Sequence, residues 1–141
     1  MSLPKTPRLT VDAVVLDAKR RLLVIRRKHP PFMSAYALPG GFVEIGETVE
    51  EACRRELFEE TGVAAGKLTL VGVYSDPDRD PRGHTCSVAF LARVRASDVR
   101  AGDDAAAARW LKTWREAEFA FDHRRIVEDA MRLARRERLR R

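Results

Sequence analysis

A helix that carries carboxylates on its apolar face constrains this chain more than any other segment. Thr48 is followed three residues later by Glu51, which is the pattern of a capping box at a helix start. Gly62 can adopt the left-handed conformation that ends a helix, so we expect the helix to run to about Thr61. At helical spacing its apolar side chains form one stripe: Val49, Ala52, Cys53 and Leu57.

Three glutamates share that stripe. Glu56 and Glu60 project into its middle, and Glu59 lies at its edge. A solvated acidic face is the common alternative, but these acids lie among core-forming residues. Burying an unpaired carboxylate is costly, and several together repel one another unless protons or cations intervene. Mg²⁺ prefers oxygen ligands, and side chains at i, i+3 and i+4 can converge on one ion, so the pattern predicts a divalent-metal site.

The loop before the helix supports the same prediction. Gly40 and Gly41 allow a close approach of the backbone, and their carbonyl groups could supply another oxygen ligand. Gly46 permits a tight entry into the helix. Glu47 and Arg55 are spaced to pair across the junction between loop and helix.

Residues 41–63 match the Nudix box at each of its defined positions. Gly41 is followed by five residues and Glu47, then by seven residues and the run RELFEETGV that starts at Arg55. The chain therefore resembles the Nudix hydrolases, and strands on both sides of the box with a C-terminal helix fit that family's fold.

The resemblance implies a loop–helix–loop that holds Mg²⁺ or Mn²⁺ against a diphosphate, where the ion would activate water and stabilise the departing phosphate. The implied metal ligands are Glu56, Glu59, Glu60 and the carbonyl of Gly40. The implied catalytic residues are Glu56, Glu59, Arg55 and Glu47. Arg55 and Glu47 would orient the ligands, and Glu56 is a candidate general base, although family members place the base differently.

Further elements follow from apolar runs and turn residues. Strands are expected at residues 9–16, 22–27, 68–74, 87–94 and 109–111. Residues 29–41 are expected to form a surface loop that touches ligand. Asp122 should cap a last helix with an apolar face of Ile126, Val127, Ala130, Met131 and Ala134. We expect an α+β fold, a Nudix-like α/β/α sandwich with a mixed β-sheet, in one domain over residues 1–141.

Most of the net charge of +6 lies in the last ten residues. Residues 132–141 contain six arginines and one glutamate, and the rest of the chain has 21 basic and 20 acidic side chains. We interpret this tail as a solvated helix end rather than a nucleic-acid site. No apolar run is long enough for a membrane span, and Cys53 and Cys86 lack metal-ligand spacing. We therefore expect a cytoplasmic protein, and the family resemblance implies a homodimer.

The segments flanking the box resemble those of ADP-ribose pyrophosphatases. On that resemblance Phe32 or Tyr36 would stack on the base, while Arg79, Arg82 and His84 would reach phosphate or ribose. Alternatively, the two aromatic residues anchor their loop and the Asp/Arg loop pairs with itself. His84 is interpreted as a structural hydrogen-bonding residue.

Acidic residues nearer the C-terminus offer further candidates. Asp104 lies where some Nudix enzymes carry an extra acidic ligand or base, although Asp103-Asp104 before an alanine run could instead cap a helix. Glu116 and Glu118 are rival bases. Trp110 and Trp114 are most simply core or dimer contacts.

Two other functions remain open at this point. The same metal site would serve a hydrolase that removes oxidised or other non-standard nucleoside triphosphates. A non-catalytic nucleotide-sensing Nudix domain is the second alternative, which the intact box disfavours.

Overall fold

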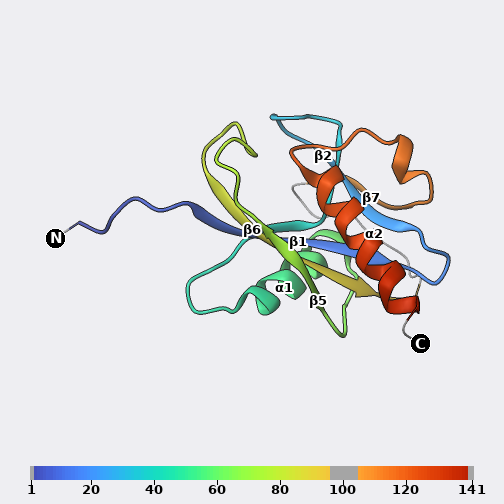
Figure 1. Cartoon of the computed structure of the whole chain (residues 1–141). Coiled ribbons are helices and arrows are strands. Elements are labelled where there is room, and N and C mark those ends of the chain that lie inside the picture. The colour runs from blue at the N-terminus through green and yellow to red at the C-terminus, as the bar shows by residue number, and fades with distance from the viewer. Residues whose placement is uncertain (1, 96–104, 140–141) are drawn as a thin grey trace.

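The computed structural model describes residues 2–95 and 105–139. Within these residues, seven strands form one sheet and two α-helices pack on it (Figure 1). The strands are β1 (Arg8–Leu16), β2 (Leu22–Arg27), β3 (Tyr36–Ala37), β4 (Gly40–Phe42), β5 (Thr69–Tyr74), β6 (Thr85–Arg93) and β7 (Ala105–Leu111). The helices are α1 (Val49–Thr61), the 3₁₀ turn η1 (Trp114–Glu116) and α2 (His123–Leu139).

Strand β1 organises the sheet. It runs parallel to β6 over its whole length, from Arg8↔Thr85 to Leu16↔Arg93. Its other edge pairs antiparallel with β4 near the N-terminal half of the strand and with β2 at Leu16. The predicted mixed sheet is therefore confirmed, and the β1–β4 pairing brings the glycine pair against the centre of the molecule.

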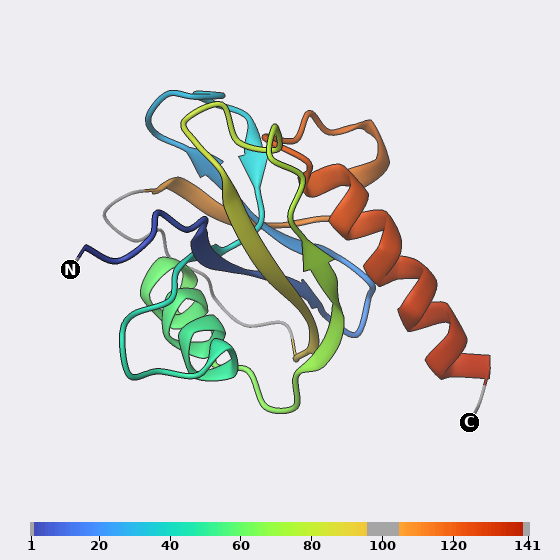
Figure 2. The same ribbon diagram turned by 60° about the vertical axis from the view of Figure 1, so that its left-hand side comes forward.

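The side chains of β1 alternate between two cores. Val14 and Leu16 belong to the core that α2 covers, whereas Val11, Ala13 and Val15 belong to the core that α1 covers. The two helices lie on opposite sides of the sheet (Figure 2). The predicted sandwich of two helical layers around a sheet is confirmed.

The ends of α1 follow the sequence pattern. The Thr48 side chain accepts the N–H of Glu51 at 3.1 Å. Gly62 has a φ of 76° and donates its N–H to the carbonyl of Phe58 at 2.8 Å. Both predicted boundaries of this helix are confirmed.

Helix α2 buries the predicted face, with Ile126, Val127, Ala130 and Ala134 in the core and Met131 packed against it. The carboxylate of Asp122 accepts hydrogen bonds from Arg79, while its backbone carbonyl receives the N–H groups of the first helical turn. Among the helices of the described residues, none is long and apolar enough to cross a membrane.

One expectation about local structure was wrong, and one alternative that had stayed open does not hold, whereas the strand expected at 109–111 is confirmed as part of β7. Residues 29–41 are more than a surface loop, because β3 pairs with β2 and β4 with β1 inside and beside this segment. These strands are only two and three residues long, so they carry no alternation that a sequence pattern could reveal. The alanine run that starts at Ala105 forms β7 rather than a helix, because it pairs with β2. Asp103 and Asp104 lie outside the described residues.

Candidate active site

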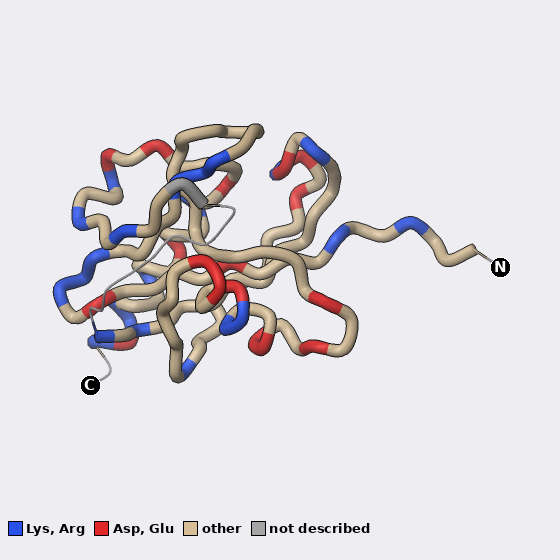
Figure 3. The backbone as a smooth tube through the Cα atoms, turned by 180° about the vertical axis from the view of Figure 1, so that it is seen from behind, with Lys and Arg blue, Asp and Glu red and all other residues tan. Residues whose placement is uncertain are grey.

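A cavity of about 950 Å³ lies between the start of β1, the glycine pair and helix α1. Glu56, Glu59 and Glu60 border it from α1, and Glu44 borders it from the preceding loop. Figure 3 marks the acidic positions of α1 and this loop in red. The structure thus brings the three predicted metal ligands of α1 to one cavity. We call Glu44, Glu56, Glu59 and Glu60 together the acidic wall of this cavity.

Glu56 is the more enclosed of the two glutamates that contact Arg55 within α1. Its side chain is 17% exposed, whereas that of Glu59 is 57% exposed. Burial raises the pKa of the Glu56 carboxyl above its ordinary value, and the hydrogen bond from Arg55 offsets part of this rise. Gly41 lies directly against the carboxylate, because a Cβ at Gly41 would stand 2.5 Å from Glu56 Cδ.

Arg55 connects the helix to the loop before it. Its Nη2 and Nε donate to the two carboxylate oxygens of Glu47 at 2.7 and 3.1 Å, and Nη2 also donates to the Phe42 carbonyl at 3.0 Å. Nη1 donates to Glu56 at 2.9 Å and to Glu59 at 3.3 Å. The Arg55 hydrogen bonds lower the pKa of Glu47. The pairing of Glu47 with Arg55 is confirmed, and its orienting role stays a prediction.

Gly40 is held between β1 and α1. Its N–H donates to Glu60 Oε1 at 2.8 Å. A Cβ at Gly40 would stand 2.0 Å from the Val11 carbonyl oxygen and 2.8 Å from Asp12 Oδ1, so no side chain fits here. The assignment of its carbonyl as a metal ligand stays a prediction.

The cavity lining also includes basic and aromatic side chains, among them Arg27, Arg82 and Phe121. The guanidinium carbons of Arg27 and Arg82 lie 4.9 and 5.4 Å from the centre of the Phe121 ring. Burial lowers the pKa of Arg27, and the positive charge of Arg82 lowers it further. The negative charges of Asp80 and Glu60 act on the pKa of Arg27 in the opposite direction, so this part of the cavity contains both arginines and acids.

Arg79 and Arg82, both predicted to bind substrate, line this cavity and also pair within the protein. Arg79 forms a two-pronged contact with Asp122, at 2.9 and 2.7 Å, and donates to Thr85 at 2.8 Å. Arg82 forms a similar contact with Asp80, at 3.1 and 2.8 Å. The Arg82–Asp80 pair lies within one loop and matches the alternative in which the Asp/Arg loop pairs with itself. The Arg79–Asp122 pair does not, because Asp122 is 43 positions away in the sequence.

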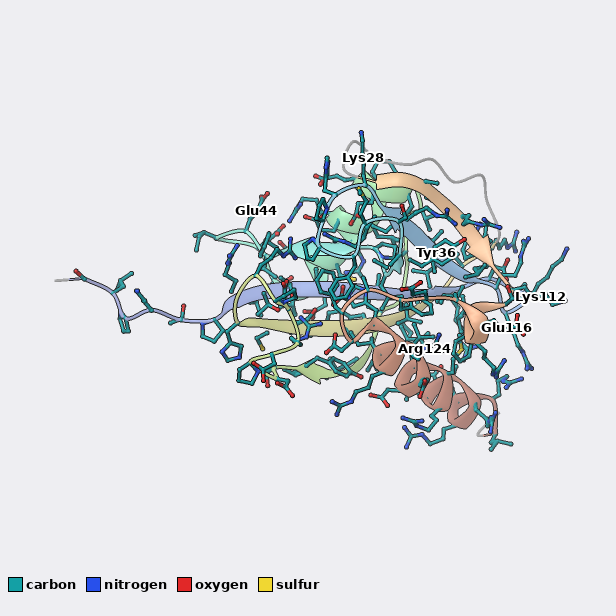
Figure 4. All side chains as sticks on the ribbon, turned by 90° about the horizontal axis from the view of Figure 1, so that it is seen from above. Lys28, Tyr36, Glu44, Lys112, Glu116 and Arg124 are labelled. Carbon is teal, nitrogen blue, oxygen red and sulfur yellow. The ribbon has the colours of Figure 1, made fainter. Side chains whose placement is uncertain are left out.

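The two predicted base-stacking residues lie in different places. Phe32 is 45% exposed and packs edge-on against Phe121, a residue of the cavity lining, with ring centres 5.0 Å apart. The hydroxyl of Tyr36 accepts hydrogen bonds from Arg26 at 2.8 Å and Arg109 at 3.3 Å. Arg26 also covers the Tyr36 ring. Figure 4 shows Tyr36 well separated from Glu44 of the acidic wall, so Phe32 is the better placed of the two.

The remaining candidates have structural contacts. His84 bonds the Ser75 carbonyl at 2.9 Å, as expected of a structural histidine. Glu118 contributes its carbonyl to the Tyr36 N–H, and Glu116 lies in η1. Asp104, the predicted extra acid, lies outside the described residues.

Sequence reasoning missed several residues of the cavity wall, among them Asp12, Arg27, Phe121 and His123. Asp12 interrupts the apolar run of β1, and an acid within a buried strand was the available signal. His123 offered no such signal, because its place depends on how α2 meets β1.

The acidic side chains suit a divalent cation chemically. Carboxylate oxygens are the ligands that Mg²⁺ prefers, and one or two of them commonly act together with substrate phosphates. Within residues 2–95 and 105–139, no group of three or more acids, histidines or cysteines forms a closed set around an ion. Glu60 instead accepts from Gly40, and Glu56 and Glu59 accept from Arg55. An open site that substrate completes fits these residues better than a dedicated cage.

Comparisons with known proteins agree with this geometry. The NUDIX domain model matches residues 6–130. An ADP-ribose pyrophosphatase from Methanocaldococcus jannaschii is 48% identical over 126 residues, covering 89% of this chain and 74% of that protein.

Two solved structures add ligands to the comparison. The Nudix domain of NrtR from Shewanella oneidensis, complexed with ADP ribose, has a TM-score of 0.83 at 28% identity, covering 96% of this chain and 90% of that chain. A bifunctional NMN adenylyltransferase/ADP ribose pyrophosphatase from Francisella tularensis, complexed with AMP and a Mn ion, has a TM-score of 0.80 at 31% identity, covering 93% and 43%. The family match over most of its length shows that this chain belongs to the Nudix family.

Proposed function

We propose that this Nudix hydrolase cleaves the diphosphate of ADP-ribose into AMP and ribose 5-phosphate. Water adds to one phosphorus, the bond from that phosphorus to the bridging oxygen breaks, and the bridging oxygen leaves with its electron pair on the other phosphate. The observation that carries this proposal is one cavity lined both by the glutamates of α1 and by Arg27, Arg82 and Phe121. The relative from Methanocaldococcus jannaschii supports the choice of substrate.

In this proposal the substrate binds to Arg27, Arg82 and Phe121, the basic and aromatic part of the cavity lining. Arg27 and Arg82 line the cavity and direct positive charge towards the phosphates, while Arg82 keeps its contact with Asp80. Phe121 and Phe32 offer apolar surface to the adenine or the sugar. Arg79, held by Asp122 and Thr85, keeps a fixed positive charge beside them.

The acidic wall carries the chemistry in this proposal. Glu56, Glu59 and Glu60, with the Gly40 carbonyl, would hold Mg²⁺ or Mn²⁺. Such an ion would neutralise the diphosphate and lower the pKa of a water molecule bound to it. Arg55 and Glu47 orient the glutamates through the contacts described above. Glu56, which borders the cavity, is assigned as the acceptor of the proton that the attacking water loses.

Three further assignments belong to the same proposal. We assign Mg²⁺ as the physiological ion, a homodimer as the assembly and the cytoplasm as the location. The Mn ion of the Francisella relative supports a divalent cation in general.

A substrate panel with product analysis tests the proposed activity. ADP-ribose, NADH, sugar nucleotides, diadenosine polyphosphates and nucleoside triphosphates are compared by kcat/KM, and products are separated by chromatography. We expect ADP-ribose to give AMP and ribose 5-phosphate with a kcat/KM above that of every nucleoside triphosphate. A preference of about tenfold or more for dGTP or its oxidised form, equivalent to about 1.4 kcal/mol in the barrier, would overturn the assignment.

A matched pair of variants separates the acidic wall from the rest of α1. Glu59→Gln alters a cavity glutamate, whereas Glu51→Gln alters an exposed glutamate of the same helix. We expect Glu59→Gln to lose about tenfold or more in kcat/KM, as changes at metal sites do. Glu51→Gln should keep wild-type turnover. Equal activity of the two variants would contradict the proposed role of the wall.

A further inference from the structure

A buried aspartate–histidine pair contacts the segment that precedes the glycine pair. Asp12 in β1 and His123 at the start of α2 are each 6% exposed, and both border the cavity. His123 Nε2 lies 3.4 Å from Asp12 Oδ1, and the Ser87 hydroxyl donates to Asp12 Oδ2 at 2.5 Å. Arg79 Nη2 stands 3.9 Å from Asp12 Oδ2 and supplies a positive charge.

The contact of the other ring nitrogen of His123 shows which nitrogen carries the ring hydrogen. Nδ1 accepts the backbone N–H of Leu38 at 3.0 Å. A nitrogen that accepts carries no hydrogen, so the ring hydrogen resides on Nε2 and points towards Asp12. Burial lowers the pKa of His123, which keeps this ring neutral near pH 7.

Leu38 begins the segment that leads into the acidic wall. The Pro39 carbonyl accepts the N–H of Ala13 at 2.8 Å, and Gly40 donates its N–H to Glu60. Three successive residues are thus held by α2, β1 and α1 in turn. Proline has no N–H, so the Leu38 and Gly40 amides are the two donors that fix this turn from opposite sides.

Simple filling of volume does not account for the pair. An apolar side chain of similar size would fill the same space without burying a carboxylate and an imidazole, and such replacements are often neutral or stabilising. The polar contacts instead fix the orientation of the ring. The ring can accept the Leu38 N–H only in the orientation in which Nε2 also faces Asp12.

We propose that His123, oriented by Asp12, is a positioning residue that fixes residues 38–41 so that Gly40 meets Glu60 and Gly41 meets Glu56. This inference rests on the proposed function of the acidic wall. The pair acts from the α2 side of the sheet on the glutamates of the α1 side, and the Leu38–Gly40 turn is the connection.

Three substitutions at one position test the proposal. His123→Asn keeps an acceptor oxygen near the place of Nδ1, His123→Gln moves the polar group towards the place of Nε2, and His123→Leu keeps only volume. We expect kcat of the leucine variant to fall by about tenfold or more, with a smaller change in KM for ADP-ribose, because misplacement by about 1 Å can cost 10²-fold. The asparagine variant should recover most of that loss, and the glutamine variant less.

A readout without nucleotide or metal accompanies the kinetics. Amide hydrogen exchange at Leu38 and Gly40 should accelerate by about tenfold in His123→Leu and stay near wild type in His123→Asn. The Leu91 amide of the β1–β6 ladder serves as the control for global opening.

The outcomes are distinguishable from a failure of the proposed function. Unchanged exchange at Gly40 in the leucine variant overturns the positioning role, whichever nucleotide is the substrate. Altered exchange with no activity on ADP-ribose in any variant overturns the substrate assignment and leaves the positioning role supported. If the leucine variant does not fold, equal exchange in the asparagine and glutamine variants overturns the role of the Nδ1 acceptor.

Discussion

Gly41→Ala should impair turnover while the fold remains intact. The added Cβ would stand 2.5 Å from Glu56 Cδ and 2.6 Å from both carboxylate oxygens. Ordinary contact begins at 3.4 Å, so the carboxylate must retreat by about 0.9 Å. A displacement of about 1 Å at a reacting group can cost 10²-fold, so we expect kcat/KM to fall by about 10- to 100-fold, or roughly 1.4–2.8 kcal/mol in the barrier.

The stability cost should be smaller than the loss of activity suggests. The contacted atoms are the end of a side chain rather than backbone, although Arg55 holds them at 2.9 Å. Gly66→Ala is the matched control, because a Cβ there would meet nothing within 4 Å. Steady-state kinetics and thermal melting are measured on both variants. Wild-type turnover of a folded Gly41→Ala protein would refute the assigned place of Glu56.

Three further perturbations address neighbouring contacts. Gly40→Ala should lower the free energy of unfolding by about 2–3 kcal/mol in urea titrations, because its Cβ would overlap the rigid Val11 carbonyl. Arg55→Lys should destabilise the protein less than Gly40→Ala in the same assay and reduce kcat, because a lysine cannot reproduce the two-pronged contact with Glu47. His123 has a pKa lowered by burial, so below about pH 6.5 the unfolded chain takes up a proton that the folded chain does not. The stability present above that pH should therefore fall on acidification, by up to about 1.4 kcal/mol per pH unit more in the wild type than in His123→Asn.

Short-range sequence patterns predicted helix α1 and its contact with the preceding loop. The capping box at Thr48, Gly62 and the apolar stripe located α1 and its buried glutamates. The spacing of Glu47 and Arg55 predicted their contact. These features lie within one loop–helix unit, so cap residues, helix periodicity and short-range spacing are enough to predict them.

The rest of the site depends on contacts between distant segments. Leu38 and His123 are 85 positions apart, and Asp12 and Ser87 are 75 apart. Arg79 was predicted to reach substrate, but its partner Asp122 lies 43 positions away at the start of α2. No local pattern reports such pairs, because they arise only when β1, β6 and α2 pack together.

The central claim is that the acidic wall binds a divalent cation for diphosphate hydrolysis. Comparing wild type with Glu60→Gln, in turnover of ADP-ribose and in Mg²⁺-dependent melting, tests it most directly. Glutamine keeps an oxygen that can accept the Gly40 N–H, although it loses the negative charge that attracts Arg27, so metal-free stability should change little. Glu51→Gln is the control, with an exposed glutamate on the same helix. Turnover of Glu60→Gln should fall by about 10²-fold, and Mg²⁺ at about 100 times its Kd should stabilise the wild type by about 2.7 kcal/mol and the variant by less. Retained turnover with equal Mg²⁺-dependent shifts in Tm would contradict the account.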